Sequence, residues 1–78
     1  MKGSNHMSHI EWTPLKYGKT GGYGGSIWYC IEALPHHIEE LRGRWGLTAW
    51  GNGHRLVGRT TIHSTLDEAK AAAAEASK

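Results

Sequence analysis

The chain has 78 residues, a formal net charge of +2 and one cysteine, Cys30. A chain of this length forms a single domain with a small margin of stability. One cysteine excludes an internal disulfide framework, and no apolar run approaches the roughly 20 residues that a membrane-spanning helix needs.

The N-terminal stretch MKGSNHM (residues 1–7) resembles a remnant of an expression vector, so we expect the domain to span residues 8–78. The N-terminus also lacks the apolar core of a signal peptide, which predicts a cytoplasmic protein. Apolar and polar residues alternate from His9 to Tyr17 and predict a first strand. Pro14 cannot donate to a sheet, so either this strand lies at an edge or its pairing is interrupted there.

The next segment, GKTGGYGG (residues 18–25), contains a Gly-Lys-Thr triplet. A phosphate-binding loop also needs a glycine five residues before Gly18, where this chain has Thr13, and the triplet does not open a helix. The sequence therefore predicts a glycine-rich hairpin connection. Its mobile tip carries side chains that are able to follow a phosphate backbone: Lys16, Tyr17, Lys19 and Tyr23.

β-Branched and aromatic residues make Ile27 to Leu34 the strongest strand signal, and apolar residues on both faces predict a central strand. Cys30 is expected as a small buried side chain. Pro35 to Gly43 is predicted to connect strands through one helical turn, with Ile38 and Leu41 facing inward. No zinc-ligand spacing occurs, so we expect neither a metal nor a cofactor.

Two further strands are predicted at Arg44 to Gly51 and Arg55 to Ile62, joined by an Asn52-Gly53 hairpin turn. Alternation would place Trp45, Leu47, Leu56 and Ile62 against the helix, with Gly58 beneath it. The outer face would then carry the candidate binding residues Arg44, Trp50, Arg55 and Arg59.

The C-terminal segment from Ser64 is predicted to be a helix. Thr65 and Glu68 have the spacing of a capping box, and alanines with high helix propensity follow. One apolar stripe is expected at Leu66, Ala69, Ala73 and Ala76. The predicted fold class is therefore α+β: a four-stranded antiparallel sheet, mostly a meander, with one C-terminal helix packed on one face.

Residues 57–58 (Val-Gly), followed by residues 65–69 (Thr-Leu-Asp-Glu-Ala), resemble a passage of the ethylene-response-factor DNA-binding domains of plants. Arm-binding domains of phage integrases are related small modules. The resemblance covers Arg44 to Ala76 and implies a sheet that lays an Arg- and Trp-rich face into the major groove of DNA. This chain has three more residues before the helix cap, no Phe there and fewer arginines on the sheet.

Two classes of function follow. The first is a nucleic-acid-binding module, in which arginine contacts phosphates and aromatic rings stack on bases. The second is a phage- or mobile-element-type protein that binds and modulates a larger protein partner, since Trp, Tyr and Arg are also enriched in protein hot spots. An exposed edge strand offers a route to a homodimer. No nucleophile or acid–base pair emerges, so an enzyme is not expected.

Overall fold

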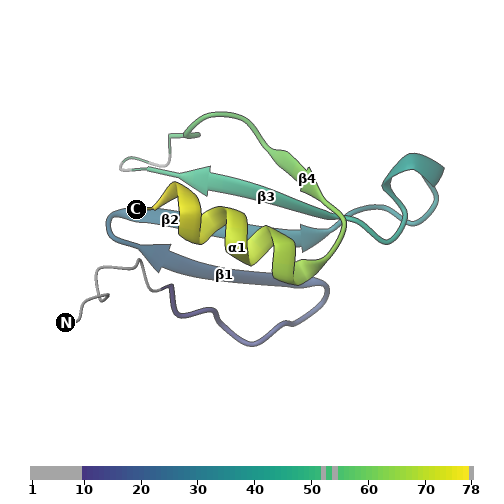
Figure 1. Cartoon of the computed structure of the whole chain (residues 1–78), viewed down its shortest axis with the longest axis horizontal. Coiled ribbons are helices and arrows are strands. Elements are labelled where there is room, and N and C mark those ends of the chain that lie inside the picture. The colour runs from purple at the N-terminus through teal and green to yellow at the C-terminus, as the bar shows by residue number, and fades with distance from the viewer. Residues whose placement is uncertain (1–9, 52, 54, 78) are drawn as a thin grey trace.

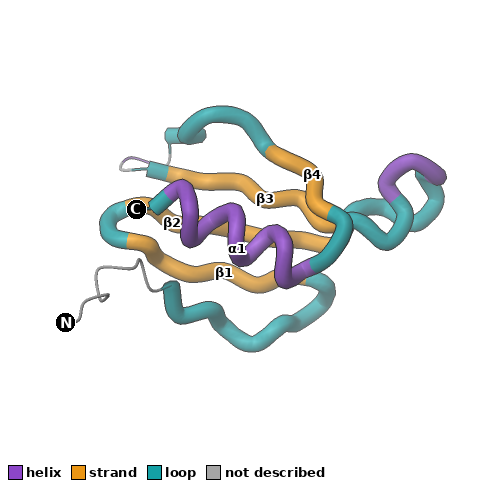
Figure 2. The backbone as a smooth tube through the Cα atoms, in the orientation of Figure 1, coloured by secondary structure: helices purple, strands orange, loops and turns teal. Residues whose placement is uncertain are grey.

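Four antiparallel strands in chain order form a meander, and one helix lies across one face of it (Figure 1). The computed structural model describes residues 10–51, 53 and 55–77. The elements are β1 (Lys19–Gly24), β2 (Ile27–Ala33), β3 (Trp45–Trp50), β4 (Thr61–His63) and α1 (Leu66–Ala76). This arrangement confirms the predicted α+β fold class and the position of the helix (Figure 2).

The strand register divides the sheet into two faces. On β2, Tyr29 lies opposite Gly22 of β1 and Ala49 of β3, and this face packs on α1. Because side chains alternate along a strand, the neighbouring residues point the other way. We call that second side the open face; its residues are Lys19, Gly21, Tyr23, Trp28, Cys30, Glu32, Gly46, Thr48, Trp50 and Ile62.

The core lies between α1 and the sheet. Its buried apolar residues are Ile10, Tyr29, Ile31, Leu47, Ala69 and Ala73. Ala69 and Ala73 are completely buried, so the helix presents a smooth surface to the larger side chains of the sheet. Trp45 packs against this core, as the sequence predicted, whereas Ala76 is exposed and does not extend the apolar stripe.

The glycine-rich segment was predicted to be a connection, and that prediction is wrong because it forms β1. A Cβ atom at Gly22 would lie 2.7 Å from the backbone oxygen of Glu11, so glycine lets the preceding segment cross the strand closely. The tight turn lies earlier, at Tyr17 and Gly18, whose φ angles of 53° and 74° suit a two-residue hairpin.

The strand predicted at residues 9–17 is also absent from the described residues that precede Lys19. Residues 10–16 run beside β1 with few ladder hydrogen bonds, among them Thr13 N to Gly21 O at 2.8 Å. The Thr13 hydroxyl instead accepts a hydrogen bond from Gly21 N at 3.1 Å. Pro14 has no N–H to continue the ladder. His9 lies outside the described residues.

The fourth strand is shorter than predicted, and its faces are exchanged. Trp50 pairs with Leu56 instead of Arg55, so the connection is one residue longer than a two-residue turn. A shift of one residue exchanges the two faces of a strand. Ile62 therefore lies opposite Gly46 on the open face. Gly58 has no atom near its Cβ position and does not lie beneath the helix.

The connection from β2 to β3 contains the predicted helical turn as a short 3₁₀ helix, Glu39–Leu41. It begins later than expected, and Ile38 is exposed instead of facing inward. At the start of α1, Thr65 Oγ1 accepts a hydrogen bond from Glu68 N at 3.0 Å, which confirms the predicted N-cap. Within the described ranges, no helix has the length and apolar character needed to span a membrane.

Candidate functional site

Three aromatic side chains form a row across the open face. Tyr23 of β1 lies directly opposite Trp28 of β2, which lies directly opposite Trp50 of β3. The rings of Tyr23 and Trp28 are 4.8 Å apart between centroids and inclined by 58°. Tyr23 is 63% exposed and Trp50 is 36% exposed. This aromatic row, Tyr23–Trp28–Trp50, therefore offers ring surfaces to solvent on three adjacent strands.

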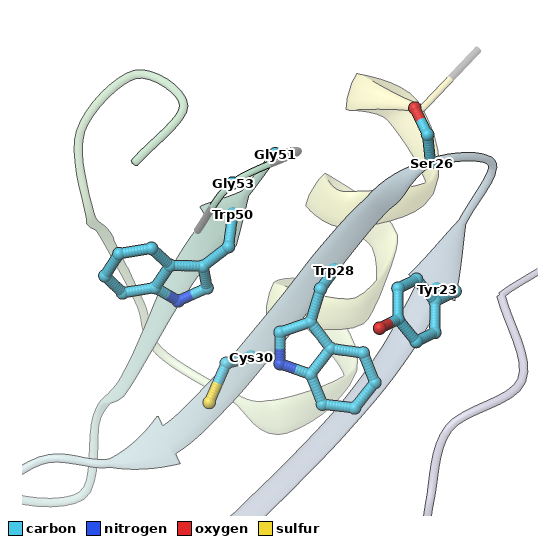
Figure 3. Close-up of a pocket in the computed structure, with 7 residues that line it drawn as sticks. All are labelled: Tyr23, Ser26, Trp28, Cys30, Trp50, Gly51 and Gly53. Atoms are coloured by element: carbon cyan, nitrogen blue, oxygen red, sulfur yellow. The ribbon is translucent and has the colours of Figure 1, made fainter. Parts of the chain in front are cut away.

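The two indoles of the row lean apart and leave a hollow between them. Trp28 leans over β1, where Gly21 leaves room for it: a Cβ atom at Gly21 would lie 2.6 Å from Trp28 Cη2. Trp50 is the cross-strand partner of Trp28, and Cys30, two residues after Trp28 on β2, lies beside the gap between the two rings (Figure 3). We call this hollow the indole cleft. It is open to solvent, has a volume of about 820 Å³ and is lined by Tyr23, Ser26, Trp28, Cys30, Trp50, Gly51 and Gly53.

The described residues that line the indole cleft are uncharged at neutral pH. None of these seven is a carboxylate or a cation. Burial raises the pKa of the Cys30 thiol, and the negative charge of Glu32 adds to this rise while Lys19 opposes it. The thiol therefore keeps its proton, and Cys30 is partly exposed instead of buried in the core as the sequence predicted.

Charged side chains gather at the opposite end of the open face. Lys19 lies directly opposite Glu32. Arg44 precedes β3 and continues its pairing, because Leu34 N donates a hydrogen bond to Arg44 O at 3.0 Å. Lys19 is four residues from Tyr23 on the same strand, a separation of about 13 Å at 3.3 Å per residue. The open face thus has an aromatic end and a charged end.

The structure brings together only some of the residues that the sequence singled out. Lys19, Tyr23 and Trp50 share the open face, and Arg44 lies at its charged end. Lys16 lies in the turn before β1, with its Nζ 5.8 Å from the centre of the Tyr17 ring.

Arg55 and Arg59 are exposed, but they lie in the connection between β3 and β4, outside the strands. The prediction that alternation along one strand places them beside Trp50 is therefore wrong. The reason is the same longer connection that pairs Trp50 with Leu56.

Sequence reasoning did not select two residues of this site, Trp28 and Cys30. Their alternation with Tyr29 and Ile31 indicates that they share a face. It does not indicate which face the helix covers, since both faces of β2 carry apolar residues. The nearby glycine at position 21 was a usable signal, because a strand glycine often marks a close approach by another group.

Other sites considered from the sequence find less support. Among residues 10–51, 53 and 55–77, no three His, Cys, Asp or Glu side chains are grouped so that they could hold a metal ion. The outer edge of β1 is partly occupied by Thr13 and Lys16, which bond to Gly21 and Lys19. The outer edge of β4 is only three residues long. Dimer formation through an edge strand stays a prediction.

The chain matches no protein-family model, and no curated protein or solved structure is significantly similar to it. The function is therefore argued from the site itself.

Proposed function

We propose that the protein is a small, non-enzymatic nucleic-acid-binding module that uses the open face of its sheet. The observation that carries this proposal is the aromatic row Tyr23–Trp28–Trp50, in register on three adjacent strands, with Tyr23 and Trp50 exposed and Trp28 partly exposed. Exposed aromatic rings on a sheet are typical platforms for bases, and stacking contributes about 1–3 kcal/mol per base. The described residues of the cleft lining include no acid–base pair of the kind that supports catalysis.

Two cations on the same face suit the phosphate groups of such a ligand. Lys19 and Arg44 lie at the charged end, although Glu32 beside Lys19 reduces the local positive charge. Two phosphate contacts on a single strand give a slope of log K against log salt of about −1.4, since each contributes about −0.7. Stacking is less sensitive to salt, so we expect weak binding with a shallow salt dependence.

The sequence resemblance to DNA-binding domains that use a sheet face supports the same class of function. In the domains that the sequence resembles, the sheet enters the major groove with arginine on its surface. Here Arg55 and Arg59 lie in the connection between β3 and β4, and Lys16 lies in the turn before β1. Because all three are outside the strands, they are proposed as peripheral contacts. The central contacts are assigned to Lys19, Tyr23, Trp28, Arg44 and Trp50.

Fluorescence anisotropy with labelled single-stranded and duplex DNA, at about 20 and 200 mM salt, tests this proposal. The wild type should bind DNA in the micromolar range at low salt. The double substitution Tyr23→Ala and Trp50→Ala should weaken binding at least 10-fold, because two stacking surfaces are removed. The double substitution Lys19→Ala and Arg44→Ala should flatten the salt dependence.

Two variants on other surfaces serve as controls. Tyr17→Ala removes an aromatic side chain that is 91% exposed in the turn before β1. Lys70→Ala removes a cation on the helix, where the Lys70 ammonium lies 6.0 Å from the centre of the Trp12 ring. Both should bind DNA like the wild type. Absence of binding by the folded wild type at low salt would refute the proposal.

A second candidate function, binding to a protein partner, rests on a separate observation. Exposed aliphatic side chains share the open face with the aromatic row: Leu56 pairs with Trp50, and Ile62 lies toward the charged end, opposite Gly46. Contiguous exposed apolar surface is typical of protein interaction sites. In that case Leu56→Ala would weaken capture of the partner while leaving any DNA binding unchanged.

A further inference from the structure

The indole cleft is the feature that most narrows the choice of ligand. Its walls are the rings of Trp28 and Trp50, and Cys30 lies beside the gap between them (Figure 3). A flat, uncharged group with two ring faces fits such walls, because aromatic side chains stack well on planar rings. A phosphate or a carboxylate would find no cation among the described residues of this lining.

Polar groups at the cleft include the donors of Trp28 and Cys30 beside the hydroxyls of Tyr23 and Ser26, which both donate and accept. Figure 3 shows the indole nitrogen of Trp28 on the side of the ring that faces Cys30. An indole N–H is a donor only, and a protonated thiol is a weak donor. The raised pKa of Cys30 keeps that proton in place at neutral pH. The carbonyl oxygens of pyrimidine bases are acceptors and complement this lining.

Base faces are available in a single strand and covered in a duplex. In double-stranded DNA every base is stacked between its neighbours, so a protein reaches only base edges in the grooves. The open face offers ring surfaces at its aromatic end and few groups that read edges. In single strands, unstacked bases lie on aromatic side chains, and a four-stranded sheet accommodates two or three of them.

The distance between the aromatic end and the charged end of the open face suits a nucleic-acid strand that runs from one end to the other. Lys19 lies about 13 Å along β1 from Tyr23, by the rise of 3.3 Å per residue. A bound strand with bases on the aromatic row would thus bring its continuing phosphates to Lys19 and Arg44. The acidic residues of the helix, Asp67, Glu68 and Glu75, belong to the element on the other side of the sheet.

From these observations we propose that the ligand of the open face is single-stranded nucleic acid. One unpaired base occupies the indole cleft beside Cys30, and a neighbouring base stacks on Tyr23. This inference rests on the proposed nucleic-acid-binding function and specifies its substrate class and the position of a base.

The test compares three labelled probes at about 20 mM salt: a 12-nucleotide oligothymidylate, an oligonucleotide of the same length with abasic central positions, and a hairpin duplex. The abasic probe keeps its phosphates and loses its base faces. We expect oligothymidylate to bind the wild type about 10-fold or more tightly than either of the others, because stacking is lost in both.

Substitutions at Cys30 test the position of the base. Cys30→Leu places a larger side chain in the cleft and should weaken oligothymidylate binding about 10-fold. Cys30→Ser keeps the size and the donor and should stay within about 2-fold of the wild type. Circular dichroism checks that both variants fold. The comparison of abasic and intact probes uses the wild type. It therefore tests whether binding needs base faces even if Cys30→Leu fails to fold.

The outcomes separate this inference from the function on which it rests. Equal binding of all three probes, or oligothymidylate binding by folded Cys30→Leu at wild-type strength, overturns the inference and leaves a nucleic-acid-binding module. Absence of binding by every probe overturns both, and the open face then belongs to a protein partner. Tight oligothymidylate binding that is lost in the abasic probe and in Cys30→Leu supports the inference.

Discussion

The indole of Trp28 lies directly over Gly21, its diagonal neighbour on β1. A Cβ atom at Gly21 would come within 2.6 Å of Trp28 Cη2, so glycine at this position allows the ring to lean toward β1. The same tilt separates Trp28 from Trp50, its cross-strand partner, and opens the cleft above Cys30. The absence of a side chain at Gly21 on β1 therefore affects the shape of the indole cleft, whose walls come from β2 and β3.

Gly21→Ala should disturb this arrangement without unfolding the protein. The added methyl group forces the indole away from β1, and overpacking of this kind costs about 1–3 kcal/mol. The ring is on the open face and has space to move, so we expect the lower part of that range. Tryptophan fluorescence should change its emission maximum, and urea unfolding measures the loss of stability.

The neighbouring substitution Gly22→Ala provides the comparison. Its methyl group would meet the backbone oxygen of Glu11 at 2.7 Å, on the side of the sheet that carries the core. A backbone segment yields less readily than the end of a side chain, so Gly22→Ala should be more destabilising than Gly21→Ala. A milder effect of Gly22→Ala would contradict the packing described for residues 10–13.

Trp45→Ala should destabilise the protein far more than Trp50→Ala. Trp45 packs against the core beneath α1, and loss of a core tryptophan costs about 3–5 kcal/mol. Trp50 is on the open face, where we expect a loss of about 1 kcal/mol or less. Thermal melts of the two variants measure the difference. The reverse order would mean that the two faces of β3 are exchanged.

Thr65→Ala should lower the free energy of unfolding by about 1 kcal/mol, because the hydroxyl that accepts from Glu68 N is lost. Ser64→Ala is the matched control. Ser64 contributes its backbone N–H, which donates to Glu68 Oε1 at 3.2 Å, and alanine keeps that group. Denaturant unfolding should therefore distinguish the two neighbours, and equal losses would place the N-cap elsewhere.

Stability should fall at alkaline pH in part through Cys30. Burial raises the pKa of this thiol above its ordinary value of 9.0, so the folded protein holds the proton more tightly than the unfolded chain. The resulting stabilisation is complete below pH 9 and is lost as the pH rises through the folded pKa. Urea unfolding between pH 8 and pH 10 should show a smaller decline for Cys30→Ala than for the wild type.

Tyr29 adds a second alkaline contribution, since burial also raises its pKa above 10.0. Its effect begins at higher pH, and Tyr29→Phe removes it without emptying the core. Identical declines for the wild type and Cys30→Ala between pH 8 and pH 10 would contradict the assignment to Cys30.

Local signals in the sequence were sufficient for the helix and for β2. Thr65 and Glu68 mark the start of α1 by a short-range hydrogen bond, and the β-branched and aromatic run marks β2. The glycines of β1 misled the prediction because their role is tertiary. Gly22 lets the backbone at Glu11 approach closely, and Gly21 lets the Trp28 ring approach closely. Neither contact can be read from the residues next to these glycines in the sequence.

The candidate site was predictable only in part for a related reason. Alternation within one strand correctly placed Trp50 and Trp45 on opposite faces of β3. Arg55 and Arg59 were placed by continuing that alternation through a turn, and a single extra residue in the connection reversed it. The cleft depends on the register among three strands, which no local pattern specifies.

A nitrogen–proton correlation spectrum of the protein titrated with oligothymidylate shows whether nucleic acid binds at the open face of the sheet. The four tryptophans provide four indole N–H signals. Trp28 and Trp50 lie on the open face, whereas Trp12 and Trp45 pack against the core on the helix side. We predict that the indole signals of Trp28 and Trp50 shift on titration while those of Trp12 and Trp45 stay in place. Shifts confined to Trp12 and Trp45, or no shift at any of the four, would contradict binding of nucleic acid by the open face.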